Sequence, residues 1–385
     1  MERKVIICIR NILTMIKAFK FRIYPNAEQE EIFAKHLGSC RFAYNWGLAK
    51  KIELYQKENK RISCFELINE LTKLKREEQY SWLAEINSQS IQQSLRHLDN
   101  AFTKFFREKK GFPKFHKKTG KQSFTIPQNV KIDFENNSIQ LPKCKNVKTV
   151  LHRNFEGKIK TCVVSKNPSG KYFISILVEN DKITPELKPI LESTAVGIDL
   201  GIKDFAVLSN GEKIANPKHL KSKEKKLAKH QKRLSRKNKG SKNRLKQKLR
   251  VAKIHEQITN ARNDFLHKTS KKIVDSFDTI ITENLNVKGM VKNHNLAKAI
   301  SDCSWGTFTS MLEYKCNWYG KNYVKIGRFE PSSRLCLCGT INKDLKLSDR
   351  EWTCQVCNST HDRDILAAQN IKTFGLQKQN LIQAI

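Results

Sequence analysis

The N-terminal part of the chain contains a short run of alternating apolar and polar residues. Residues 17–24 place Phe19, Phe21 and Ile23 at every second position, with basic residues between them. Alternation with a period of two is typical of a strand that buries one face. Because proline cannot donate to a sheet ladder, Pro25 is expected to end this strand.

Helical periodicity dominates residues 26–110. Its clearest example has apolar side chains at steps of four and three residues, the spacing of one helix face: Ile91, Leu95, Leu98, Phe102 and Phe105. From about residue 120 to residue 190 short alternating segments separated by turns predict strands instead. We expect a small β-barrel formed by residues 15–28 and 119–190, with a helical domain, residues 29–118, inserted after its first strand.

The second half begins with a predicted strand and hairpin at residues 195–216, where Asn210-Gly211 is a typical two-residue turn. Residues 218–250 then hold 16 Lys/Arg and a single acid. Leucines repeat every seven residues in this segment, and a second apolar periodicity follows Gly240-Ser241. These apolar positions predict an ordered basic helical hairpin over residues 218–275 rather than a disordered tail, although charged runs are often only a solvated surface.

The exposed face of this hairpin is a candidate nucleic-acid contact. Its basic side chains would contact phosphates, and the five that we single out are Lys225, Lys229, Lys232, Arg233 and Arg236.

Composition supports a polyanionic partner. The chain has 385 residues, a formal net charge of +36 and 39% hydrophobic residues, enough for several folded domains. Charge of this size opposes compaction unless a polyanion neutralises it, which favours nucleic acid. An anionic membrane is the other candidate, but no apolar run approaches the ~20 residues of a spanning helix. The apolar stretch near the N-terminus is too short for a signal peptide, so we expect a cytoplasmic protein.

Three acidic residues occupy settings that suit a metal site. Asp199 and Glu283 each follow a short run rich in β-branched residues, which predicts buried strands that end in a carboxylate, and Asp364 begins an alanine-rich helix. Together they would form a set of oxygen ligands that holds Mg²⁺ against a phosphodiester, so this basic chain is predicted to be a nuclease. Asp362 would point about 200° away from Asp364 on a helix, so we favour Asp364.

Four of the eleven cysteines cluster near the C-terminus. Cys336, Cys338, Cys354 and Cys357 form Cys-x-Cys, fifteen intervening residues and Cys-x-x-Cys, which predicts one structural Zn²⁺. The first pair is one residue shorter than a usual zinc knuckle, and a glycine after Cys338 would relieve part of the strain. A degenerate loop, or a site in which His361 replaces one thiolate, remains an alternative.

An ordered set of motifs resembles the TnpB family, the transposon-encoded RNA-guided DNA endonucleases related to type V CRISPR effectors. The resemblance covers nearly the whole chain. Its main motifs are Ile16-Lys-Ala-Phe-Lys-Phe-Arg-Ile-Tyr-Pro25, Asn87-Ser-Gln-Ser-Ile-Gln-Gln-Ser-Leu-Arg96, Gly197-Ile-Asp-Leu-Gly-Ile-Lys203, Asp264-Phe-Leu-His-Lys-Thr-Ser270, Glu283-Asn-Leu-Asn-Val-Lys-Gly-Met290, Ser304-Trp-Gly-Thr-Phe308 and Pro331-Ser-Ser333.

The resemblance implies a multidomain α+β protein whose nuclease core is RNase H-like (RuvC). That core would comprise residues 191–330 and 360–385, with a zinc-binding module, residues 331–359, inserted in it. Residues 1–14 would be a non-native extension, because family members commonly start near Met15. Two Mg²⁺ ions would be held by the three acids. Tyr44 and Asn45 match the family's nucleic-acid-facing region, with packing in the protein core as the alternative to base stacking.

The implied function is RNA-guided cleavage of DNA. A guide RNA from the same mobile element would pair with one strand of a double-stranded target after the protein reads a short adjacent motif, with one protein monomer per RNA. A nuclease-inactive regulator from the same family is the main alternative, although such regulators tend to lose one acid. A single-strand transposase would need a His-x-His pair, which this chain lacks.

Overall fold

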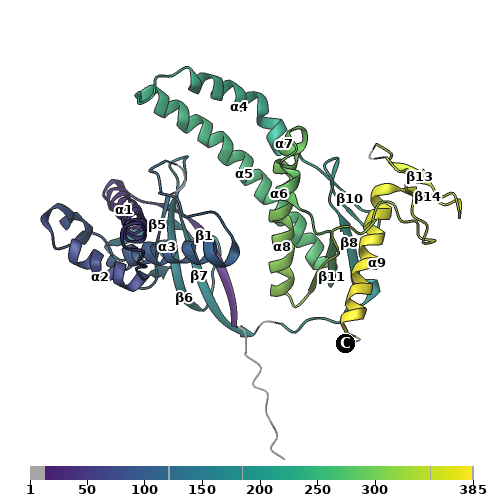
Figure 1. Cartoon of the computed structure of the whole chain (residues 1–385), viewed down its shortest axis with the longest axis horizontal. Coiled ribbons are helices and arrows are strands. Elements are labelled where there is room, and N and C mark those ends of the chain that lie inside the picture. Colours follow the sequence, from purple (N-terminus) through teal and green to yellow (C-terminus); the bar gives the residue numbers. More distant parts are fainter. Residues whose placement is uncertain (1–13, 120–121, 184, 347, 384–385) are drawn as a thin grey trace, which may run out of the picture. The chain divides into compact units, whose positions relative to one another are not determined.

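The structure is a computed structural model that describes residues 14–119, 122–183, 185–346 and 348–383. The extension predicted at residues 1–14 lies, except for Thr14, outside the described residues. The chain divides near residue 183 into an N-terminal and a C-terminal unit, each with its own sheet (Figure 1). The chain is therefore a mixed α+β protein.

The sheet of the N-terminal unit has seven strands in the order β2-β6-β7-β1-β5-β4-β3. Its β1 is the predicted N-terminal strand, with Phe21 and Ile23 buried. We predicted a small β-barrel. Because β2 and β3 are edge strands of this order, the described strands form an open half-barrel. The strands are β1 (Thr14–Tyr24), β2 (Gln122–Ile126), β3 (Lys131–Asp133), β4 (Ser138–Leu141), β5 (Cys144–Val150), β6 (Lys158–Lys166) and β7 (Tyr172–Ile183).

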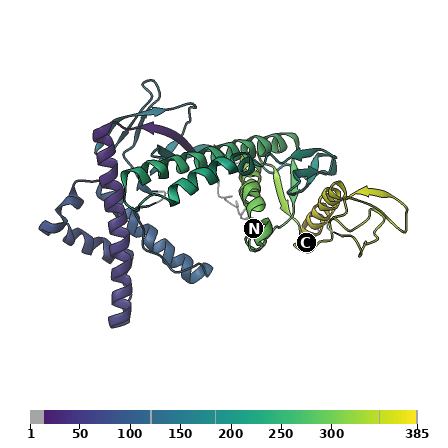
Figure 2. The same cartoon turned by 90° about the horizontal axis from the view of Figure 1, so that it is seen from above.

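Helices follow β1 directly in this unit. A capping box formed by Asn26 and Gln29 starts α1 (Ala27–Glu58), the long purple helix in Figure 2. The others are α2 (Cys64–Leu74), a 3-10 helix (Glu78–Ala84) and α3 (Ser88–Glu108). The predicted apolar face of α3 is confirmed over its first half, since Leu95 and Leu98 are fully buried.

The sheet of the C-terminal unit has the order β10-β9-β8-β11-β12. β8 (Ala195–Asp199) pairs antiparallel with β9 (Asp204–Leu208), which continues into β10 (Lys213–Ala215) through the predicted hairpin turn. On its other side β8 pairs parallel with β11 (Thr279–Thr282), and β11 pairs parallel with β12 (Asn322–Lys325). The carboxyl ends of β8 and β11 consequently lie at the same edge.

One face of this sheet packs against α5 (Lys242–Ser276) and α8 (Trp305–Trp318). Val196 and Ile198 of β8 share a buried cluster with Leu266 of α5 and Phe308 of α8. Two shorter helices, α6 (Val287–Met290) and α7 (His294–Cys303), connect β11 to α8, and a 3-10 turn (Glu192–Thr194) precedes β8.

The opposite face packs against α9 (Arg363–Gln383). Ile371 of α9 lies in a buried cluster with Ile281 of β11 and Val324 of β12. A Cβ atom placed on Gly197 would lie 2.1 Å from the carbonyl oxygen of Ala368, so only glycine allows this approach of helix and strand.

The predicted basic hairpin is an ordered pair of helices. Ser241 caps α5 at the break between it and α4 (His219–Ser235), and the two helices run side by side in both views (Figures 1 and 2). Leu227 of α4 is buried against Ile254 and Ile258 of α5. The apolar positions thus hold the hairpin together and leave its basic side chains outside.

The remaining element is a two-stranded antiparallel sheet of β13 (Glu351–Thr353) and β14 (Thr360–Asp362). It leads directly into α9. Among the helices of the described residues, none combines the length and the apolar character that crossing a bilayer requires.

Candidate functional site

Asp199 lies at the end of β8, on the strand face that packs against α9. Side chains of a strand alternate between its two faces, so Gly197 and Asp199 share a face while Val196 and Ile198 point to the opposite core. The close approach at Gly197 holds the helix beside the Asp199 carboxyl group. The strand's alternation and one glycine together determine where this acid lies.

Glu283 follows β11 on the same side of the sheet. Ile281, two residues earlier, packs toward α9, since a Cβ on Gly375 of that helix would lie 2.4 Å from the Ile281 side chain. The Glu283 Oε1 accepts a hydrogen bond of 2.7 Å from the Ser332 hydroxyl. Ser332 belongs to the Pro331-Ser-Ser333 motif, to which the sequence analysis assigned no role.

Asp364 lies in the first turn of α9, the predicted alanine-rich helix, and Ala367 and Ala368 are buried one turn later. Both of its carboxylate oxygens are in ion pairs, with Arg363 and Arg350 each at 3.2 Å. No sequence pattern predicted a role for either arginine. A cation that binds to Asp364 would compete with these guanidinium groups.

Asp362 has a different position from the one predicted by helical phase. It ends β14, and its Oδ1 accepts hydrogen bonds from the backbone N–H groups of Asp364 and Ile365, at 3.0 and 3.1 Å. Its Oδ2 pairs with Lys213 Nζ at 2.6 Å. Asp362 therefore caps the helix, so the angular argument does not apply, and the choice of Asp364 as the metal ligand stays a prediction.

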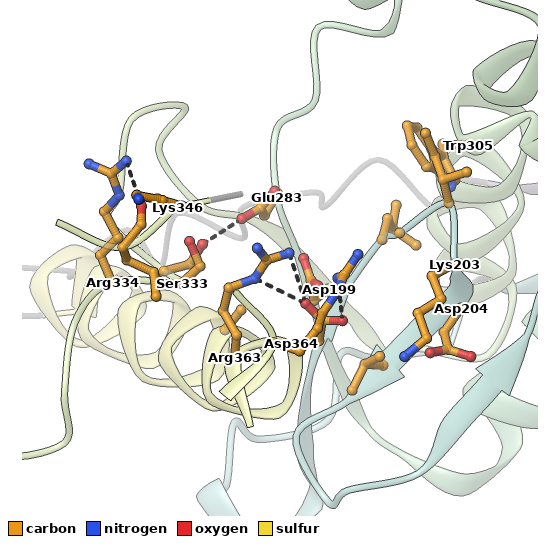
Figure 3. Close-up of a pocket in the computed structure, with 18 residues that line it drawn as sticks. Asp199, Lys203, Asp204, Glu283, Trp305, Ser333, Arg334, Lys346, Arg363 and Asp364 are labelled. Carbon is orange, nitrogen blue, oxygen red and sulfur yellow. Dashed lines mark hydrogen bonds and ion pairs between the residues drawn. The ribbon is translucent and has the colours of Figure 1, made fainter. Parts of the chain in front are cut away.

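The three acids line one pocket of about 360 Å³ (Figure 3). Burial, and then the charges of Glu283 and Asp364, raise the pKa of Asp199 to about 7. Carboxyl groups crowded in this way need a cation to remain charged together, and oxygen donors of this kind fit Mg²⁺. Basic side chains that suit a phosphate backbone also line the pocket: Lys203, Arg334, Lys346, Arg350 and Arg363.

The four predicted zinc ligands also come together. Their Sγ atoms all lie within 4.8 Å of one another, and the group joins the Cys336–Cys338 turn to the turn after β13. Gly339 has φ +90°, a conformation that favours glycine, and donates its N–H to the carbonyl of Cys336, which closes the turn after the short pair. This donor set fits one tetrahedral Zn²⁺.

His361 lies beside the cysteines. Its Nε2 is 3.1 Å from Cys336 Sγ, and its ring packs at 5.1 Å from that of Trp352. The histidine is therefore placed to hydrogen-bond a thiolate while the four sulfurs form the group. Burial raises the pKa of Cys336, whereas hydrogen bonds with Thr340 lower the pKa of Cys338.

The remaining predicted residues lie outside both sites. All five basic residues chosen on the hairpin, Lys225, Lys229, Lys232, Arg233 and Arg236, are exposed. Tyr44 is buried and stacks on His116 with ring centroids 3.8 Å apart. Asn45 exchanges two hydrogen bonds with the His116 backbone. This pair anchors the segment after α3, and its contact with nucleic acid stays a prediction.

Three family models match the chain. The model OrfB_IS605, described as "Probable transposase", matches residues 175–294. A "Helix-turn-helix domain" model matches residues 15–60, and a "Cas12f1-like, TNB domain" model matches residues 305–371. These matches fall in both units.

Curated proteins match over nearly the full length. A Streptomyces pristinaespiralis protein named "Putative RNA-guided DNA endonuclease" is 42% identical and aligns over 94% of this chain and 89% of its own length. The Escherichia coli (strain K12) protein named "Putative RNA-guided DNA endonuclease InsQ" is 34% identical, with 94% and 92% covered. A Cas12f1 chain from a complex with sgRNA and target DNA superposes with a TM-score of 0.57 at 16% identity, covering 93% of this chain and 99% of that one, so it shares the fold.

Proposed function

Because the chain belongs to the TnpB family, we propose that it is the RNA-guided DNA endonuclease of a mobile element. The observation that carries the proposal is that Asp199, Glu283 and Asp364, from the ends of two strands and the start of a helix, line one pocket together with basic side chains. A guide RNA and a double-stranded target DNA would be the partners. The protein would read a short motif beside the target before the RNA pairs with it.

We assign residues 191–330 and 360–385 to a RuvC-like nuclease domain. Support comes from a sheet with one antiparallel and one parallel half, and from acids at the carboxyl ends of two neighbouring strands. Asp199, Glu283 and Asp364 would hold two Mg²⁺ ions. Bound there, the ions would activate water and stabilise the leaving oxygen of the phosphodiester.

The chain's own residues would orient these groups and the DNA strand. Ser332 holds Glu283 through its hydroxyl, and the Asp362 cap fixes the first turn of α9, where Asp364 lies. Arg350 and Arg363 would neutralise phosphates as the DNA strand enters, because one guanidinium group can donate two parallel hydrogen bonds to a phosphate. Each role depends on a position that the fold holds before substrate arrives.

Residues 331–359 would form the zinc-binding module, with Cys336, Cys338, Cys354 and Cys357 as ligands of one structural Zn²⁺. The close sulfurs support this proposal. Leu366 of α9 packs into the buried cluster of this module with Cys336 and Cys354. The module would thereby support the start of α9, two residues from Asp364.

The test uses the protein co-expressed with its guide RNA and a matching DNA target in Mg²⁺. Asp199→Ala, Glu283→Ala and Asp364→Ala should each slow cleavage by at least about a hundredfold, since each removes a ligand of the metal ions that would stabilise the transition state. Target binding should stay near the wild-type level, because its affinity comes from many phosphate contacts. Asp362→Asn, which keeps the helix cap, is the matched control and should cleave.

An active Asp364→Ala variant together with an inactive Asp362→Asn variant would refute the assignment on α9. Wild-type protein that binds its target but never cuts it would instead favour the nuclease-inactive regulator.

A further inference from the structure

A second concave surface, larger than the acidic pocket, lies entirely within the N-terminal unit. It encloses about 810 Å³ between the last turns of α1, the loop that follows, and the end of α3. We call it the aromatic groove and define it by Tyr55, Phe102, Phe105, Phe106 and Phe112. None of these residues belongs to the site described above.

The groove forms where the apolar face of α3 becomes exposed toward the C-terminal end of the helix. Leu98 is fully buried, but two turns later Phe106 is 66% exposed. Tyr55 and Phe112, on the facing segments, are 57% and 46% exposed. Exposing large aromatic side chains to water is unfavourable, and a patch of them usually marks a binding surface.

The rings hold one another in place. Phe112 meets Phe102 and Phe105 edge to face, with centroids 5.5 and 5.4 Å apart, and Phe105 meets Phe106 at 5.0 Å. Edge-to-face contacts of this kind are favourable. The exposed ring faces are therefore already ordered for a flat, apolar ligand.

The charges around the rings select an anion. Lys51 lies over Phe102 and Arg61 over Phe106, at 5.4 and 6.0 Å from the ring centroids. Four basic residues line the groove, Lys51, Lys60, Arg61 and Arg107, against two acidic ones. An unpaired nucleotide combines both properties, because its base is flat and its backbone is anionic. A duplex fits less well, since its base faces are already stacked on one another.

Two acids line the groove, and one of them favours ribose over deoxyribose. Glu66 already accepts the backbone N–H of Ser63 at the start of α2, which leaves Asp99. Asp99 lines the groove, and its Oδ1 is 3.4 Å from Lys51 Nζ. A carboxylate accepts hydrogen bonds, and the 2′-hydroxyl of RNA can donate one whereas deoxyribose has no donor there. We infer that the aromatic groove binds an unpaired stretch of RNA, with bases stacked on Phe106 and its neighbours. This RNA contact is one that the proposed function does not specify.

The experiment measures binding by the full chain, without cleavage, of a single-stranded RNA of alternating adenine and cytosine, which cannot pair with itself. Its counterpart carries abasic spacers in place of the bases. Phe106→Ala should weaken binding of the RNA by about tenfold, the order expected for one lost base–aromatic stack, and leave the abasic chain unaffected. Phe106→Tyr keeps the ring face and should bind as the wild type does.

Phe65→Ala is the matched control, because Phe65 is a 72% exposed phenylalanine of the neighbouring helix α2 outside the groove. Phe65→Ala should leave the affinity for the RNA and the affinity for the abasic chain unchanged. Equal loss for the RNA and the abasic chain, or equal loss in both variants, would overturn the stacking role.

Two further outcomes would replace the RNA with another occupant. DNA of the same sequence that binds as tightly as the RNA, with the same dependence on Phe106, would overturn the choice of ribose. A Phe106→Ala variant that keeps its RNA affinity but changes its oligomeric state in solution would show that a second copy of this chain fills the groove. All of these measurements are independent of cleavage. The RNA-binding proposal can therefore fail while the proposed nuclease activity stands, and the nuclease activity can fail while the RNA-binding proposal stands.

Discussion

The carboxyl group of Asp362 accepts hydrogen bonds from two backbone N–H groups at the start of α9. Removing a capping side chain costs about 0.5–2 kcal/mol. Asp362→Ala should therefore lower the melting temperature, whereas Asp362→Asn should stay close to the wild type because asparagine caps equally well. Thermal unfolding of both variants measures the difference. Equal destabilisation by the two substitutions would mean that the ion pair with Lys213, and not the cap, matters.

Lys315 is a buried lysine of α8. Its Nζ donates to the carbonyl of His267 and the hydroxyl of Ser270, both at 2.8 Å. Burial, and then the nearby charge of Lys271, lower its pKa from 10.5 to about 8, while Asp275 opposes the shift. Between these two pH values the unfolded chain binds a proton that the folded chain does not. The free energy of unfolding should therefore rise with pH across this window.

Substitution isolates this contribution from other titrating groups. Lys315→Met should remove a rise of at most about 3 kcal/mol between pH 8 and 10.5, obtained from denaturant unfolding at several pH values. Lys288→Met, at an exposed lysine, is the control and should leave the curve unchanged. A Lys315→Met curve that parallels the wild type over this range would show that the lysine keeps its ordinary pKa.

At the scale of elements, the site depends on the contact between β8 and α9. Gly197→Ala would place a methyl group 2.1 Å from the Ala368 carbonyl oxygen, which the helix can relieve only by moving away. Overpacking of this kind costs about 1–3 kcal/mol. Displacement of Asp364 by about 1 Å can slow catalysis by about a hundredfold.

Gly306 of α8 provides the comparison, since a Cβ there meets no atom within 4 Å. Gly306→Ala should be tolerated in both thermal unfolding and cleavage. Normal cleavage by Gly197→Ala would show that α9 can shift without cost to the site.

The zinc module gives a prediction at the same scale. Protein purified without added zinc should contain close to one Zn²⁺ per chain, and Cys354→Ser should lose it, because a three-thiolate site binds far more weakly. Cys64→Ser, which changes a cysteine outside the group, should retain the metal. Elemental analysis measures both. Active protein that contains no zinc would indicate a module held by packing alone.

At the scale of the whole molecule, the net charge of +36 makes binding of nucleic acid depend on salt. Replacing Lys225, Lys229, Lys232, Arg233 and Arg236 together by glutamine should weaken binding. It should also reduce the slope of log affinity against log salt by about 0.7–0.9 per lost phosphate contact. A salt titration of wild type and variant checks this. An unchanged slope would indicate that the basic face of the hairpin is only a solvated surface.

Local patterns in the sequence were sufficient for much of the fold. The alternation of residues 17–24, the apolar positions of α3 and α5, and the turn at Asn210-Gly211 all correspond to observed elements. Such features are determined by backbone geometry and nearby side chains, so they can be predicted without tertiary contacts. The open edge of the N-terminal sheet could not, because closure depends on pairing between strands distant in the chain.

For the sites, the sequence by itself determined the kinds of ligand. These are two acids at the ends of predicted strands, one acid at the start of a predicted helix, and four closely spaced cysteines. Only the tertiary structure decided that Lys213 pairs with Asp362, that Arg350 pairs with Asp364, and that Tyr44 stacks on His116. The physical reason is that a side chain's role depends on the partners that folding brings to it. Those partners lie on other elements, where no local periodicity records them.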